Sequence, residues 1–328
     1  MECEKLTIEV KNVILRIMSK FDASKFIKEK INEIKSVAKE DRVLVLVSEG
    51  VDSVVCALLA YNAIKENAIF LYVNTGLVKS DKSDVLNKFL QKYNIELQVW
   101  DMNEKFFQAL KEKTVTEEKI EIYKDIFYRT ISQATKSYSV EYVIQGTILP
   151  DIIEFQKGVK TFYNVFQDDI NPQIYGLKII EPLKELYKNQ VYSIAKLLKI
   201  PPKIVHVFPF PFTGFTTRIG GEITAERIEK IRLLSSIVEE EFKSPKIYQA
   251  FPVLLGEKAA GIINEKKITG DVVVVRAVET KNIISARPYN PTCSKMEKIQ
   301  KRIIREVPGV VKVLFDITPK PPSDIEFF

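Results

Sequence analysis

Five consecutive apolar residues, Val43–Val47, run without a polar interruption and stop at a short turn, Ser48-Glu49-Gly50. A short run that is apolar at every position is typical of a strand buried on both faces of a parallel sheet. The alternation continues, with strands expected at 42–47, 68–76, 95–102 and 140–147 and helices at 53–67, 83–94 and 131–139. The sequence therefore predicts βαβ units and an α/β fold.

The rest of the chain divides around this region. One or two amphipathic helices are expected within 6–39, and the segment between Glu154 and Leu177 has no clear period, which favours a functional loop. A helix is expected over 181–200, followed by a proline-rich stretch. Beyond it, helices at 224–242 and 294–307 and strands at 271–279 and 310–318 indicate a smaller α+β domain. We expect three parts: an N-terminal helical segment (1–41), the α/β domain (42–204) and the α+β domain (205–328).

Composition narrows the class of protein. With 328 residues, 46% hydrophobic and 28% charged, the chain can form two well-cored domains. Its three cysteines form no Cys-x-x-Cys pair, which argues against disulfides and a zinc site and predicts a cytoplasmic protein. No apolar run approaches the roughly 20 residues that span a bilayer. A net charge of +6 is spread along the chain, so neither a membrane nor a nucleic acid is expected as a partner.

The ligand of such a sheet binds at the carboxyl ends of its strands, here Ser48-Glu49-Gly50, Asn74-Thr75-Gly76 and Gln145-Gly146-Thr147. Gly50 permits close backbone approach, and Asp52 can hold Mg²⁺ or cap the helix expected from about Ser53. The loop lacks the Gly-Lys-Ser/Thr of a Walker loop. A simple N-capped helix is the alternative interpretation, and the Glu49 carboxylate would repel a bound phosphate.

The loop Ser48–Ser53, with the sequence SEGVDS, resembles the Ser-Gly-Gly-x-Asp-Ser pyrophosphate loop of the N-type ATP pyrophosphatases (PP-loop proteins). From about residue 42 to its end, the chain is similar to one family among them, the ATP-pyrophosphatase subunits of two-subunit GMP synthetases. The distinctive segments are Gln145-Gly146-Thr147 with Pro150-Asp151, and the terminal Lys320-Pro321-Pro322 with Ile325-Glu326. The resemblance implies a Rossmann-like PP-loop domain followed by a dimerisation domain.

The activity that the resemblance implies is a two-step ligation. ATP adenylates XMP with release of pyrophosphate, and ammonia then displaces AMP to give GMP, with Mg²⁺ as a further cofactor. A glutaminase needs a catalytic histidine, and the only histidine here, His206, has no cysteine nearby and is expected to be structural. The ammonia is therefore expected from a separate glutamine amidotransferase subunit, and the C-terminal domain is expected to form a homodimer.

The resemblance also assigns site residues. Those expected to bind ATP are Ser48, Glu49, Gly50, Val51, Asp52, Ser53, Val54, Gly76, Gln145, Gly146 and Thr147. Those expected at the reacting centre are Asp52, which is also the expected Mg²⁺ ligand, Asp151, Lys160 and Lys188. Those expected to bind XMP are Arg218, Gln249, Lys320, Ile325 and Glu326.

Some positions depart from the family pattern. Glu49 stands where the family has glycine, Asn74 where it has aspartate, and Ile120 where it has an arginine that contacts XMP. These changes lie on site loops, while the apolar framework matches. They leave two alternatives open: a catalytically impaired paralogue that serves as a binding or regulatory scaffold, and a PP-loop enzyme that adenylates another substrate.

Overall fold

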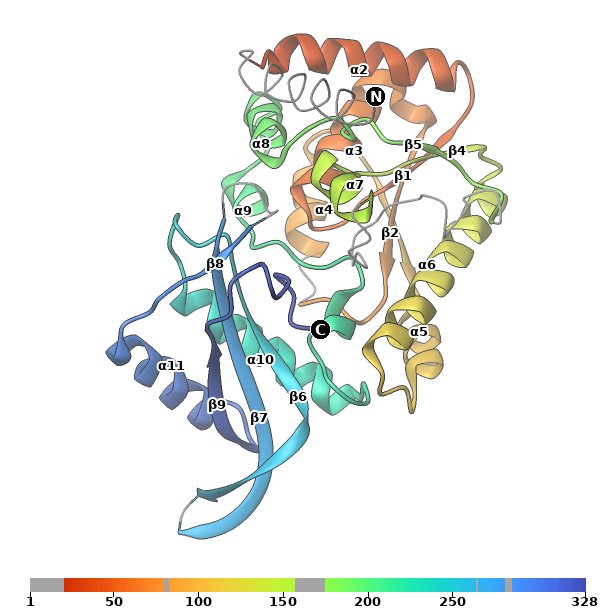
Figure 1. Cartoon of the computed structure of the whole chain (residues 1–328). Helices are drawn as coiled ribbons and strands as arrows, with labels where there is room; N and C mark the ends of the chain where they lie inside the picture. Colours follow the sequence, from red (N-terminus) through yellow and green to blue (C-terminus); the bar gives the residue numbers. More distant parts are fainter. Residues whose placement is uncertain (1–20, 80–82, 157–174, 264, 281–284) are drawn as a thin grey trace, which may run out of the picture.

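The computed structural model of the chain describes residues 21–79, 83–156, 175–263, 265–280 and 285–328. Two lobes follow one another along the chain (Figure 1). The N-terminal lobe contains a five-stranded parallel sheet, and the C-terminal lobe is dominated by a long antiparallel hairpin. The prediction of an α/β fold with a second, α+β region is confirmed.

The N-terminal sheet has the strand order β3-β2-β1-β4-β5, with every neighbouring pair parallel. Its strands are β1 (Val43–Leu46), β2 (Ala68–Asn74), β3 (Leu97–Asp101), β4 (Tyr142–Ile144) and β5 (Lys178–Ile180). The helices of this lobe are α2 (Ala23–Ala38), α3 (Val51–Ile64), α4 (Ser83–Gln91), α5 (Asn103–Leu110), α6 (Thr116–Tyr138), α7 (Leu149–Gln156), α8 (Lys188–Leu197) and α9 (Pro202–Val205), with a 3₁₀ turn η1 (Lys65–Asn67).

Both faces of β1 are covered, which explains its uninterrupted apolar run. Val43 and Val45 face a core built with α2, α3 and α8. Leu44 and Leu46 face the opposite side, where they join Tyr128 and its neighbours on α6. Successive side chains of a strand point to opposite faces, so a strand between two helical layers must be apolar at every position.

The C-terminal lobe is a sheet with helices packed on one face. Its elements are η3 (Gly214–Thr217), α10 (Ala225–Glu241), β6 (Gln249–Ile263), β7 (Lys266–Glu279), β8 (Arg287–Pro288), α11 (Cys293–Glu306) and β9 (Val310–Asp316). Thr224 caps α10 by accepting a hydrogen bond from the Arg227 amide. The 15-residue strand β6 was not predicted, because two glycines and a charged pair interrupt its pattern and its register with β7 shifts between Leu254 and Lys258.

Two predicted helices are wrong in extent. The one expected at 131–139 is only the C-terminal part of α6, which begins at Thr116. The segment expected to be helical over 181–200 forms turns until α8 begins at Lys188, and α8 ends at Leu197. Leu183 and Leu186 are buried in the core, and the Leu186 carbonyl accepts a hydrogen bond from the Leu149 amide. Tertiary contacts thus use groups that a helix would have needed for its own ladder. Of the N-terminal helical segment, α2 is confirmed and residues 1–20 lie outside the described part, as does most of the expected loop (157–174).

The two lobes are joined by hydrogen bonds to backbone carbonyls and by a shared apolar core. The Phe215 amide donates to the Leu77 carbonyl, and Arg232 of α10 donates to the carbonyls of Gly76 and Val78. Lys119 of α6 is fully buried and donates to the Ile219 carbonyl. Apolar residues of α5 and α6 also belong to the same core as α10 and α11. The loop after β2 is therefore held by the C-terminal lobe.

Candidate active site

A cavity of about 300 Å³ lies where strand order reverses, at the carboxyl ends of β1 and β4. β1 pairs with β2 on one side and β4 on the other, so the loops after β1 and β4 diverge and leave a crevice between them. The residues expected there that line the cavity are Ser48, Glu49, Gly50, Val51, Asp52, Ser53, Gln145, Gly146, Asp151 and Lys188. Val54, Gly76 and Thr147 are not among its described lining residues, and Val54 is core.

The loop after β1 folds around Ser53. Its hydroxyl accepts a hydrogen bond from the Ser48 amide (2.9 Å) and donates to the Gly50 carbonyl (2.9 Å). Helix α3 begins at Val51 rather than near Ser53, and its N-cap, Gly50, makes no side-chain cap bond. Asp52 is therefore not the cap. The N-terminus of this 14-residue helix opens onto the cavity, where its backbone N–H groups and dipole favour an anion.

Gly146 lets the loop after β4 approach the start of α3. A Cβ atom at Gly146 would lie 3.0 Å from the Ser53 amide nitrogen and 3.1 Å from the carbonyl carbon of Asp52. Both are backbone atoms, so a side chain here would push the two loops apart. Gly76 has φ +73° and a Cβ there would meet Phe107 and Asn103, so this predicted ATP contact has a packing role of its own.

Asp52 and Lys188 form an ion pair at the wall of the cavity. The Lys188 ammonium donates to Asp52 Oδ2 at 2.5 Å, and both side chains are about four-fifths buried, with exposed fractions of 19% for Lys188 and 20% for Asp52. Burial alone would lower the pKa of Lys188, but the charge of Asp52, with smaller contributions from Tyr192 and Asp151, raises it above its usual value. Lys188 is thus held as a cation beside the N-terminus of α3.

The loop after β4 is ordered by side-chain hydrogen bonds. Gln145 Nε2 donates to Thr147 Oγ1 (3.1 Å), which in turn donates to the Glu181 carboxylate (2.6 Å). Asp151, in the first turn of α7, accepts a hydrogen bond from the Ile148 amide (2.9 Å). Thr147 therefore stabilises the loop without lining the cavity, whereas Asp151 both stabilises the loop and lines the cavity.

Glu49 is accommodated without backbone strain. It is not among the described residues with positive φ, so the Cβ that replaces the family's glycine costs nothing in backbone conformation. The side chain is half-buried, lines the cavity, and has its Oε1 atom shielded from solvent. What Glu49 brings to the site is its charge.

Aromatic side chains form a wall of the cavity that the sequence analysis missed. They are Tyr123, Phe127, Phe208, Phe210 and Phe212. Phe212 packs edge-on against Tyr123 and Phe127 of α6, with ring centroids 5.5 and 4.8 Å apart. The alternation of Phe and Pro at 208–212 could have indicated this wall from the sequence, because it predicts a rigid, apolar segment between the lobes.

Three of the residues expected to bind XMP, Arg218, Gln249 and Glu326, meet where the C-terminal end of the chain reaches η3. Arg218 is fully buried and holds both oxygens of Glu326, at 3.1 and 2.9 Å, and Gln249 Nε2 donates to Glu326 Oε1 at 2.9 Å. The Arg218 guanidinium lies between the rings of Phe210 and Phe251. In this arrangement Nε and Nη2 of Arg218 are bound to Glu326, whereas the buried Nη1 has no hydrogen-bond acceptor among the described residues, so the assignment of Arg218 to XMP stays a prediction.

The two remaining residues of this group lie close by. Lys320 pairs with Asp324 (2.8 Å) and is joined by backbone hydrogen bonds to Ala286, whereas Ile325 is buried. Because Phe210 lines the cavity and also contacts Arg218, the two groups of predicted residues adjoin. Lys160 lies outside the described residues.

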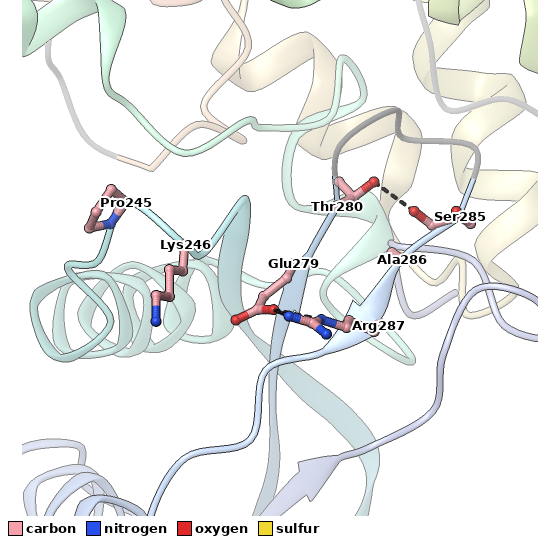
Figure 2. A pocket seen from close by; sticks show the side chains of 7 residues that line it. All are labelled: Pro245, Lys246, Glu279, Thr280, Ser285, Ala286 and Arg287. Carbon is pink, nitrogen blue, oxygen red and sulfur yellow. Dashed lines mark hydrogen bonds and ion pairs between the residues drawn. The ribbon is translucent and has the colours of Figure 1, made fainter.

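A second, open cavity of about 870 Å³ lies on the C-terminal lobe beside β7 and β8. Figure 2 shows Glu279 paired with Arg287 (2.6 Å) and Thr280 donating to the Ser285 carbonyl (2.6 Å). None of its described lining residues was predicted as a site residue, although Ala286 joins it to Lys320.

Comparisons with known proteins place both lobes in known families. The NAD synthase family model matches residues 21–210, and the model of the GMP synthase C terminal domain matches residues 236–327. The chain is 38% identical over 307 residues to one subunit of the glutamine-hydrolyzing GMP synthase of Archaeoglobus fulgidus, covering 93% of this chain and 99% of that protein. The corresponding protein of Pyrococcus furiosus is 39% identical over 306 residues, covering 92% and 97%.

Proposed function

Because the chain belongs to this family of glutamine-hydrolysing GMP synthase subunits, we propose that it is the ATP-pyrophosphatase subunit of such an enzyme. It adenylates XMP with ATP, releasing pyrophosphate, and aminates the adenylated intermediate with ammonia to give GMP. The observation that carries the proposal is the cavity at the strand-order reversal, where the N-terminus of α3 and the Asp52–Lys188 pair lie together.

The phosphates of ATP fit the loop after β1. The backbone N–H groups at the start of α3 and the cationic Lys188 supply the positive potential that a triphosphate needs. For Lys188 to reach a phosphate it must leave Asp52, which frees a carboxylate oxygen as the anion arrives. The aromatic wall offers flat apolar surface to a purine ring.

Magnesium would be held by Asp52. Its Oδ1 atom is buried and has no hydrogen-bond donor among the described residues, so it is placed to accept a cation. In the described part of the chain, no three His, Cys, Asp or Glu side chains converge on one point. Asp52 would therefore share the ion with water and phosphate oxygens, as is usual for Mg²⁺. When bound, the ion neutralises charge that develops on the departing pyrophosphate.

XMP would bind beside this cavity, at the junction of the lobes. Gln249 and Glu326 lie beside Arg218, which contacts Phe210 of the cavity. A purine nucleotide bound by Gln249, Lys320, Ile325 and Glu326 would therefore lie next to ATP. The ammonia would come from a separate glutaminase subunit, and a second copy of the chain would pair through the C-terminal lobe. No helix of the described residues is long and apolar enough to cross a membrane.

The test is GMP formation by the purified chain from XMP, Mg-ATP and ammonium, without a glutaminase. We expect AMP, pyrophosphate and GMP in equal amounts, and a loss of about 100-fold or more in Asp52→Asn, because this variant loses the charge that holds Lys188 and the cation. If pyrophosphate is released when XMP is replaced by another acceptor, the result would favour the alternative that the protein is a PP-loop enzyme that adenylates another substrate. Absence of ATP binding in the unmodified protein would refute the proposal and support a scaffold role.

A further inference from the structure

The last twelve residues of the chain, 317–328, form a tail without helix or regular strand. This tail contains Lys320, Ile325 and Glu326, three of the residues assigned to XMP under the proposed function. Figure 1 shows the tail leaving β9 and ending at the junction of the lobes. An irregular segment has no ladder to satisfy its backbone carbonyls, so its shape depends on donors from elsewhere.

Most of these donors belong to one residue, Arg276 of β7. Its side chain is fully buried, and its guanidinium donates to the carbonyls of Thr318 (3.0 Å), Asp324 (2.6 Å) and Ile325 (2.8 Å). It also pairs with the carboxylate of Asp316, at the end of β9. One guanidinium therefore ties together the start and the end of the tail.

The acceptors stand on either side of Lys320, so Arg276 closes the loop that carries it. The backbone of Lys320 is pinned separately to Ala286, with hydrogen bonds of 2.8 and 3.0 Å. The residue after Ile325 is Glu326, whose carboxylate accepts hydrogen bonds from Arg218 and Gln249, so Arg276 fixes the backbone directly before these contacts. Both ends of the substrate-binding tail are thus fixed relative to β7.

We propose that Arg276 is a positioning residue of the XMP site: it does not touch the nucleotide, but it sets the conformation of the tail that does. The inference rests on the proposed function for the identity of the nucleotide. Lysine cannot replace arginine here, because a single ammonium lacks the planar fork that bonds three separate carbonyls and a carboxylate.

The experiment compares Arg276→Lys with the unmodified protein in two measurements: calorimetric titration with XMP, and hydrogen exchange of peptides that cover 317–328. We expect faster exchange in the tail, XMP binding weaker by about tenfold or more, and unchanged affinity for Mg-ATP. The matched control is Arg302→Lys on α11, an arginine that also pairs with several carboxylates of the same lobe but does not touch the tail. It should leave both measurements unchanged.

Faster tail exchange with unchanged XMP affinity would overturn the inference and leave the proposed function standing. Failure of the unmodified protein to bind XMP would overturn the proposed function, and the inference with it. If Arg276→Lys does not fold, Asp316→Asn decides by the same two measurements, because it removes the charge that anchors Arg276 and keeps the guanidinium.

Discussion

The buried pair of Arg218 and Glu326 permits a quantitative prediction about what holds the C-terminal end of the chain to η3. Two charge-assisted hydrogen bonds of 2.9 and 3.1 Å join them, and such bonds contribute about 1.5–3 kcal/mol each. Removing one partner leaves the other charge buried, which typically costs about 3–5 kcal/mol. We therefore expect Arg218→Met and Glu326→Gln each to lower the free energy of unfolding by about that amount.

The double variant should be less destabilised than the sum of the two single changes, with a coupling free energy of about 2–3 kcal/mol. The assay is urea unfolding of all four proteins. Circular dichroism follows the whole chain, and the fluorescence of Trp100, the only tryptophan, follows the N-terminal sheet. Because the lobes share a core, the two probes should report one transition.

The matched control is the exposed pair of Arg129 and Asp125 on α6, whose side chains are 66% and 44% exposed. Water screens such a pair, so the same cycle should give a coupling free energy of at most about 0.5 kcal/mol there. Additive effects at Arg218 and Glu326, with a coupling below about 0.5 kcal/mol, would refute the reasoning that this pair is a buried structural clamp.

Three further changes test other parts of the molecule. Glu49→Gly should strengthen Mg-ATP binding about tenfold in calorimetry, because a like charge some 4 Å from a phosphate costs on the order of 1 kcal/mol or more. Glu49→Gln removes the charge and keeps the size of the side chain, so it should give most of the same gain in affinity. Gly146→Ala should lower the free energy of unfolding by about 1–3 kcal/mol in urea, since its Cβ would press on the Ser53 amide; stability equal to that of the unmodified protein would contradict this contact. Burial, with a smaller effect of the Arg227 charge, lowers the pKa of Lys119 to about 8 from 10.5. Between these two pH values the unfolded chain binds more protons than the folded protein, so the free energy of unfolding should rise with pH. Urea unfolding of Lys119→Met should lack this rise.

The local sequence pattern was sufficient to predict most strands and several helices of the N-terminal lobe. Apolar runs such as Val43–Val47 and the helical periods between them depend on neighbours in the chain, so strands β1 to β4 and helices α3 and α4 could be predicted. The carboxyl ends of parallel strands meet at one edge, so the grouping of Ser48–Gly50 with Gln145–Gly146 also followed from the sequence.

Secondary structure was predicted wrongly where tertiary contacts override the local preference of the chain. The segment 181–187 has the composition of a helix, yet Leu183 and Leu186 turn into the core and the carbonyl of Leu186 is taken by Leu149. Strand β6 lacks a clean alternation because its length comes from pairing with β7, which tolerates a shift in register. The shift places Gly256, Glu257 and Lys258 within β6, so the strand has no regular period of two although β7 follows it directly in the chain.

The sequence by itself determined which side chains were available to the site and at which strand ends most of them would stand. Only the tertiary structure decided what each one does. It paired Arg218 with Glu326 in the interior and brought Lys188 into contact with Asp52, 136 residues away in the chain. It also placed Arg276 where its guanidinium binds the carbonyls of the C-terminal tail. The physical reason is that hydrogen bonds and ion pairs are satisfied by proximity in space, and a buried charge takes whichever partner the fold brings within reach.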